Sequence, residues 1–154
     1  MQDILDVAKY ICSKVKEIDE MKLQKLLYFI QRENISIFGL PMFFGKFKAW
    51  KYGPISVKVR KAYRNKELKN SYKEISVMDR YIIDNILNQY LDKRSWELSL
   101  LTHNQKSWQD ARKGLNEYDK GYKYIDIYKD VENYRPYDSF WDMYFDEFED
   151  YYGG

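Results

Sequence analysis

The sequence predicts a mainly helical, all-α fold in a single domain, with room for a short extended or β-hairpin segment near residues 42–52. Apolar residues recur at intervals of three and four in most segments, which is the period of a helix with one buried face. No alternation of strand and helix patterns, internal repeat or low-complexity linker interrupts the chain. The 154 residues, 45% of them apolar, suit one hydrophobic core.

Two helices are predicted at the N-terminus. Residues 4–18 carry an apolar stripe that includes Cys12, which we therefore expect in the core. Asp19 is a residue type favoured as an N-cap for the next helix, which Gly39 and Pro41 end. The predicted buried stripe of this second helix is Leu23, Leu26, Leu27 and Ile30. Its predicted solvent-exposed (wet) face is Lys22, Lys25 and Arg32.

A dense aromatic and basic segment follows. Residues 47–54, FKAWKYGP, contain three aromatic side chains and two lysines before a Gly-Pro pair. Gly53 can take backbone angles that other residues avoid, and Pro54 suits the first turn of a helix. We expect a turn that fixes Trp50 and Tyr52, followed by a helix over residues 55–65. The outer face of that helix carries Lys58, Lys61 and Arg64.

The second half of the domain is predicted to contain four helices, one of them short. Residue types that favour caps and breaks mark their ends. The predicted caps and ends are Ser76 with Asp79, then Ser95, then Asn104 or Thr102 with Gly114, and finally Pro136 after a helix over residues 124–134.

Charge is segregated along the chain although the net charge is only +2. Residues 46–73 contain ten basic side chains and one acid, Glu67. This basic strip is open to three interpretations: a solvated helix face, a surface for an acidic protein partner, or, less favoured, a surface for nucleic acid.

The C-terminus has the opposite sign. Residues 137–154 contain six acids, no base and several large aromatics, and they follow the break at Pro136. We therefore divide the chain into a helical domain, 1–136, and an acidic aromatic tail, 137–154. The tail is either exposed and partly disordered or folded onto a basic surface of this molecule, its twin or a partner. Its candidate partner-binding residues are Trp141, Tyr144 and Phe148.

Several classes of function lack support. Cys12 is the only cysteine and His103 the only histidine, so no disulfide, zinc set or histidine pair can form within one chain. The seven glycines form no phosphate-binding loop. We expect no catalytic site, metal or cofactor, and we interpret His103 as a hydrogen-bonded turn residue. Without a leader pattern or a long apolar run, the protein is expected in the cytoplasm and not in a membrane.

Four blocks, taken in order, resemble a known family. They are MKLQKLLY at 21–28, AWKYGP at 49–54, SWELSLLTH at 95–103 and WQDAR at 108–112. Together they resemble the Panacea domain of SocA-like antitoxins and phage-associated proteins, over roughly residues 4–134. The chain departs from the family where Lys106-Ser107 replaces a frequent Gly-Pro, which puts that turn in doubt.

The resemblance implies a helical, non-enzymatic antitoxin that neutralises a cognate toxin, encoded by the adjacent gene, through direct protein contact. Two alternatives stay open: a proteolytic adaptor that delivers the toxin to a cytoplasmic protease, and a nucleic-acid-binding regulator suggested by the basic strip. A homo-oligomer is also open.

The candidate partner-binding residues come from the family blocks and from the charged helix. We expect Trp96 and Trp108, which belong to the same blocks, in the core rather than at the interface. The candidates before the tail are Gln24, Lys25, Tyr28, Trp50, Lys51, Tyr52, Gly53, Pro54, Lys58, Lys61, Arg64, Thr102 and His103.

Overall fold

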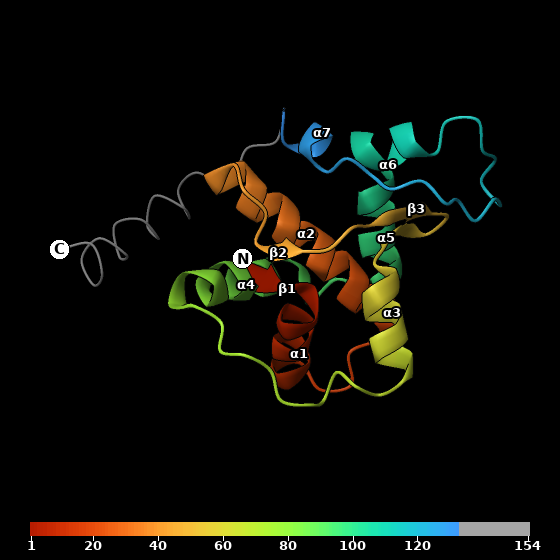
Figure 1. Ribbon diagram of the computed structural model, residues 1–154. Helices are drawn as coiled ribbons and strands as arrows, with labels where there is room; N and C mark the ends of the chain where they lie inside the picture. The colour runs from red at the N-terminus through yellow and green to blue at the C-terminus, as the bar shows by residue number, and fades with distance from the viewer. Residues whose placement is uncertain (133–154) are drawn as a thin grey trace.

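The computed structural model describes residues 1–132, and a long diagonal helix, α2, runs through the middle of them (Figure 1). The described helices are α1 (Ile4–Lys14), α2 (Glu20–Phe38), α3 (Val57–Arg64), α4 (Val77–Tyr90), α5 (Ser95–His103), α6 (Lys106–Ala111) and α7 (Tyr128–Val131). The described strands are β1 (Gln2–Asp3), β2 (Phe43–Phe44), β3 (Lys48–Trp50) and β4 (Gly53–Ile55). The prediction of a mainly helical fold is confirmed, but the short strands show that the fold is not purely α. Among these helices, none is both long and apolar enough to cross a membrane.

Helix α2 is covered on all sides. It contacts α1, α3, α4, α5, α7 and β4. Every residue from Leu23 to Ile35 is buried, including the charged side chains of Lys25, Arg32 and Glu33. The predicted wet face of this helix is therefore wrong for Lys25 and Arg32. The helical period identifies the most apolar side of α2, but other elements also cover its polar side.

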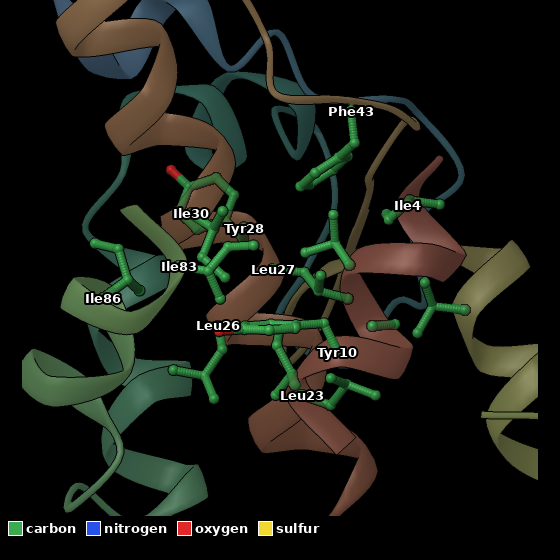
Figure 2. Packing of buried hydrophobic residues seen from close by; sticks show 14 of the residues in the cluster. Ile4, Tyr10, Leu23, Leu26, Leu27, Tyr28, Ile30, Phe43, Ile83 and Ile86 are labelled. Carbon is green, nitrogen blue, oxygen red and sulfur yellow. The ribbon is translucent and has the colours of Figure 1, made fainter. Parts of the chain in front are cut away.

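The hydrophobic core lies between α1, α2 and α4 (Figure 2). Leu23, Leu26 and Leu27 of α2 belong to this core together with Ile4 of α1, and Ile83 of α4 lies on the other side. The half-buried thiol of Cys12 packs against this cluster, and burial raises its pKa. The predicted stripe of α2 is thus part of the core.

Local capping signals proved accurate at two helices. A carboxylate oxygen of Asp19 accepts a hydrogen bond from the backbone N–H of Lys22 at 2.8 Å, at the start of α2. The hydroxyl of Ser76 accepts one from the N–H of Asp79 at 3.2 Å, at the start of α4. Gly39 ends α2 in a left-handed conformation.

Other predicted helix starts were wrong. Pro54 and Ile55 lie in strand β4, and α3 begins only after Ser56, whose hydroxyl accepts a hydrogen bond from the N–H of Val59 at 3.3 Å. Ser95 does not cap α5, because its hydroxyl donates to the carboxylate of Asp19 at 2.6 Å. Helix α6 is preceded by Gln105 and has no side-chain cap, so neither Thr102 nor Asn104 serves there.

A two-stranded hairpin with one further bridged segment replaces part of the last predicted helix. Strands β3 and β4 pair antiparallel, which places the expected hairpin at residues 48–55. On the other side of β3, the N–H of Ala49 donates to the carbonyl of Lys123 at 2.9 Å, and the N–H of Ile125 donates to that of Phe47 at 2.8 Å. We call β4, β3 and residues 123–125 the ribbon. The helix predicted from residue 124 therefore begins only at Tyr128 within the described residues.

The ribbon requires glycine at residue 53. Gly53 has φ +115°, and a Cβ there would lie 2.4 Å from the hydroxyl oxygen of Thr102 and 2.8 Å from Cε of Lys25. We predict that Gly53→Ala lowers the free energy of unfolding by about 3 kcal/mol, measured by urea denaturation. Gly39→Ala is the control, because Gly39 also has a positive φ, +72°, but no heavy atom within 4 Å of the added Cβ. It should cost about 1 kcal/mol. Equal losses in the two variants would contradict the steric explanation.

Candidate partner-binding site

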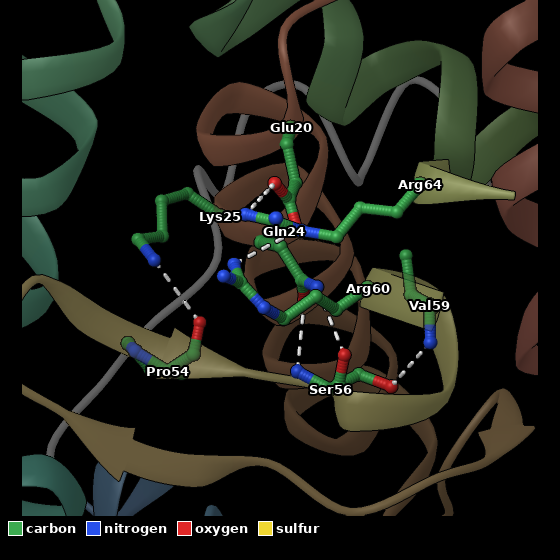
Figure 3. Close-up of polar contacts among 8 residues, drawn as sticks. All are labelled: Glu20, Gln24, Lys25, Pro54, Ser56, Val59, Arg60 and Arg64. Atoms are coloured by element: carbon green, nitrogen blue, oxygen red, sulfur yellow. Dashed lines mark hydrogen bonds and ion pairs between the residues drawn. The ribbon is translucent and has the colours of Figure 1, made fainter. Parts of the chain in front are cut away.

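Polar side chains of α2 hold strand β4 through its backbone (Figure 3). The side-chain amide of Gln24 donates to the carbonyl of Ser56 at 2.9 Å, and its oxygen accepts from the N–H of Ser56 at 2.8 Å. The ammonium nitrogen of Lys25 donates to the carbonyl of Pro54 at 3.1 Å. These bonds fix the exit of the turn against the central helix.

Lys25 is an unusual hydrogen-bond donor to the turn because its side chain is completely buried. Burial lowers the pKa of its amine from 10.5 to about 7, an effect that the nearby carboxylate of Glu20 opposes. The absence of a Cβ on Gly53 leaves the space that the end of this side chain occupies. Lys25 thus depends on Gly53 for room and on Pro54 for a hydrogen-bond acceptor.

The carbonyl groups of the turn are held in the same way. Their donors come from α2, from α5, from α6 and from the residue that follows α6. The carbonyl oxygens of Ala49, Trp50, Tyr52 and Pro54 accept hydrogen bonds from Arg112, Trp108, Ser99 and Lys25 at 2.8, 2.7, 2.5 and 3.1 Å, respectively. Because each acceptor is a backbone atom, the turn is fixed independently of its own side chains.

A buried carboxylate that the sequence did not indicate joins α2 to α6 and α7. Asp130 accepts hydrogen bonds from the hydroxyl of Tyr28 and, at 2.8 and 2.5 Å, from the backbone N–H and the hydroxyl of Ser107. Burial and this carboxylate raise the pKa of Tyr28. Ser107 belongs to the pair that departs from the family pattern. No local pattern marks Asp130, since its partners are distant in sequence.

Thr102 and His103, the two candidate partner-binding residues on α5, lie beside the turn and make different contacts. The hydroxyl of Thr102 donates to the carbonyl of Ser99 at 2.6 Å and faces the space above Gly53. The ring of His103 stacks on the indole of Trp108, with ring centroids 4.2 Å apart. Burial, together with the positive charge of Lys25, lowers the pKa of His103. His103 is therefore a neutral ring in the packing against Trp108 at pH 7.

The structure separates the sequence candidates into buried and accessible groups. The buried candidates are Gln24, Lys25, Tyr28, Gly53, Pro54 and Thr102, the half-buried ones are Trp50, Lys51 and His103, and the exposed ones are Tyr52, Lys58, Lys61 and Arg64. Trp141, Tyr144 and Phe148 lie outside the described residues, as does the domain boundary after residue 136.

An exposed apolar face on α5 was not expected. Trp96 is 56% exposed, so its predicted place in the core is wrong, whereas Trp108 is half-buried and hydrogen-bonded. Leu100 is 54% exposed one helical turn after Trp96, and Tyr52 of the turn is 56% exposed. The sequence does hold a signal, because Leu98 and Leu100 lie on different sides of one helix and only one of them can face the core.

Some of the positive charge on helix α3 is neutralised by two acids, Asp3 before α1 and Glu20 at the start of α2. Lys58 forms an ion pair with Asp3 at 3.2 Å. Arg60 and Arg64 both pair with Glu20, at 3.1 and 3.5 Å (Figure 3). Lys61 is exposed and has no ion pair with an acid of residues 1–132. The exposed Lys58–Asp3 pair contributes little to stability.

The polar side chains gathered around the turn donate mainly to backbone carbonyls. Within residues 1–132, no three His, Cys, Asp or Glu side chains group in a way that could hold a metal ion. The arrangement therefore stabilises a surface of fixed shape, with aromatic side chains on its outer side.

The fold is a small, mainly helical domain in which the turn at residues 49–54 is held against the central helix. The chain belongs to the antitoxin SocA-like, Panacea domain family, whose model matches residues 23–109, more than half of the chain. The matched region begins in α2 and ends in α6, so it contains the turn and the exposed face of α5. No curated protein and no solved structure matches the chain. Membership in this family is consistent with an antitoxin role and with a toxin as the kind of partner.

The burial of Lys25 predicts a specific pH dependence of stability. Between about pH 7 and 10.5 the unfolded chain keeps the Lys25 proton that the folded chain has lost, so this group makes stability rise with pH. Below pH 7 both states are protonated and the dependence disappears. From pH 7 to 9, wild type should gain about 2 kcal/mol in free energy of unfolding relative to Lys25→Met.

Urea denaturation at both pH values measures this difference, and other titrating groups cancel because both proteins contain them. Lys61→Met is the control for the loss of one positive charge at an exposed position. If wild type and Lys25→Met showed the same change between pH 7 and 9, the buried amine would not be the cause.

Proposed function

We propose that this protein is an antitoxin that neutralises its cognate toxin, the product of the adjacent gene, by direct binding and not by catalysis. Family membership supports this class of function. The observation that carries the mechanism is the exposed aromatic and aliphatic face beside the braced turn. Such a face on a monomer marks an interaction surface when its side chains are large and adjacent.

We propose the turn–α5 face, formed by Tyr52, Trp96 and Leu100, as the centre of the toxin contact. Trp96 and Leu100 lie one helical turn apart on the outer side of α5. Ser99, which lies between them in sequence, holds the carbonyl of Tyr52 and so keeps Tyr52 beside the helix. Tryptophan and tyrosine are the residues that most often dominate binding energy at protein interfaces.

The other sequence candidates receive two roles in this proposal. The six buried ones, including Gln24, Lys25 and Gly53, position the turn and do not touch the toxin. Because the turn is fixed before binding, little conformational entropy is lost on association. The exposed cations of α3, Lys58, Lys61 and Arg64, would accelerate encounter with an acidic toxin surface.

Substitution of the turn–α5 face should abolish neutralisation while the domain stays folded. We predict that Trp96→Ala with Leu100→Ala weakens toxin binding by about 100-fold, which corresponds to a loss of about 2.8 kcal/mol for the two truncated side chains together. Growth rescue on co-expression with the adjacent gene, and the dissociation constant of the purified pair, measure the effect. Leu40→Ala with Phe44→Ala is the matched control, since these side chains are 64% and 67% exposed outside the proposed face.

Wild-type affinity in the Trp96 and Leu100 variant would show that the toxin binds elsewhere. If wild type itself neither bound nor rescued, the antitoxin proposal would fail. The half-life of the toxin in cells separates the two mechanisms: an unchanged half-life with full rescue supports masking, and a shortened one supports delivery to a protease.

The acidic segment after Pro136 is proposed as a second contribution, acting on a basic nucleotide-handling or RNA-handling groove of the toxin. A chain truncated after Pro136 should then neutralise less well in the same growth test. Full neutralisation by the truncated chain would limit the contact to the folded domain.

A further inference from the structure

Cationic and aromatic side chains lie next to one another on the side of β3 that faces away from the core. Phe47 and Ala49 are 3% and 0% exposed and face the core, so the alternation of a strand turns Lys46, Lys48 and Trp50 outward. Lys48 is paired with Tyr124 on the neighbouring segment, which places these two side chains on the same side. In Figure 1 the blue segment that leads to α7 passes beside β3.

The rings on this side are in contact with cations. The ammonium nitrogens of Lys46 and Lys48 lie 5.3 and 5.5 Å from the ring centroid of Tyr124. Lys120 lies 4.4 Å and Arg60 5.1 Å from the centroid of Trp50. We define the ribbon face as Lys46, Lys48, Trp50, Arg60, Lys120, Tyr122 and Tyr124.

The ribbon face is short of negative charge. The sequence contains no acid from residue 39 to residue 66 and none from residue 120 to residue 125. Lys46, Lys48 and Lys120 form no ion pair with an acid of residues 1–132, whereas Lys58 and Arg64 of α3 do. Among residues 1–132, Arg60 alone connects this face to a carboxylate, that of Glu20. Cations that gather at one place without a described carboxylate partner favour an anionic partner.

We infer that the ribbon face binds single-stranded nucleic acid, an activity separate from toxin neutralisation. Lys48 lies on β3 and Lys46 two residues before it, and Tyr124, which is bridged to Lys48, follows Tyr122 by two residues. Extended chain rises about 3.3 Å per residue, so the two lysines and the two tyrosines form neighbouring pairs with a spacing of up to about 6.6 Å. A single strand also consists of two parallel repeats, one of phosphates and one of bases with free faces.

The rings distinguish a single strand from other anions. Tyr122 and Tyr124 are 72% and 55% exposed, so their faces are accessible to unstacked bases. In a duplex the bases are already stacked and offer no faces to these rings. An acidic polypeptide would use the cations but would have no general partner for two adjacent tyrosines. The lysines that now lie over Tyr124 can move to phosphates, because their stems are flexible.

Fluorescence anisotropy on the full-length protein tests the inference. The probes are labelled single strands of uridine or of thymidine, about 12 nucleotides long, a duplex of the same length, and an oligoglutamate peptide. Both single strands should bind at low salt more tightly than the duplex and the peptide. A preference for the uridine strand would identify RNA as the natural ligand, and equal binding would identify single strands of either kind.

Two pairs of substitutions test base stacking and phosphate binding separately. Tyr122→Ala with Tyr124→Ala should weaken single-strand binding by about tenfold or more, through lost stacking. Lys46→Gln with Lys48→Gln should weaken it and lower the salt dependence, with the logarithmic slope falling by about 1 to 2. Tyr128→Ala on α7 and Lys66→Gln after α3 are the matched controls and should bind as wild type does.

Circular dichroism checks that each variant is folded. If the tyrosine substitutions disturb the ribbon, the variant with Lys46→Gln and Lys48→Gln still tests the inference. Absence of single-strand binding at low salt would overturn the inference. Equal binding of duplex and single strand with no effect of the tyrosines would also overturn it, as would tighter binding of oligoglutamate, which would indicate an acidic protein partner. The variant with Trp96→Ala and Leu100→Ala lacks the proposed toxin-binding face but keeps the ribbon face. It should bind single strands as wild type does, so single-strand binding can be tested independently of toxin neutralisation.

Discussion

The central constraint in this fold is that the buried polar side chains of α2 must find hydrogen-bond partners inside the protein. An unpaired buried polar group is costly, so each such side chain restricts the position of whatever pairs with it. Gln24 and Lys25 pair with the backbone of strand β4 and the residue after it. Gln31 pairs with the backbone N–H of Met42 and the carbonyl of Phe43, and so fixes the start of strand β2. The central helix therefore positions two short extended segments whose own sequences have little preference for a structure.

Features that depend on residues close together in the chain could be predicted from sequence, whereas features that depend on distant partners could not. Asp19 and Ser76 were identified as caps because a cap acts on residues two or three positions away. The helical period predicts a solvent-exposed Lys25 because it contains no information about what covers the polar side of the helix. The pattern from residue 124 predicts a helix because the bridge partner of Tyr124, Lys48 of β3, is distant in the chain. The turn at 50–54 was found from its composition, but the exposure of Trp96 depends on packing between helices and was missed.

A run of like charge in the sequence is also not one surface in space. The basic strip at 46–73 divides at the end of β4. After that point, three of the four cations of α3, Lys58, Arg60 and Arg64, are paired with carboxylates of Asp3 and Glu20. Before it, Lys46 and Lys48 lie against an aromatic ring and have no described carboxylate partner. The two parts therefore differ in the charge they present to a partner, although their composition is similar.

The backbone anchoring of the turn has an evolutionary consequence. Arg112, Trp108, Ser99 and Lys25 hold carbonyl oxygens, and every residue type supplies a carbonyl. Lys51 and Tyr52 can therefore be exchanged for other amino acids without loss of any of these anchors. Selection for a new partner can act on such positions while the framework beneath them is conserved, so one scaffold can diversify its specificity without refolding.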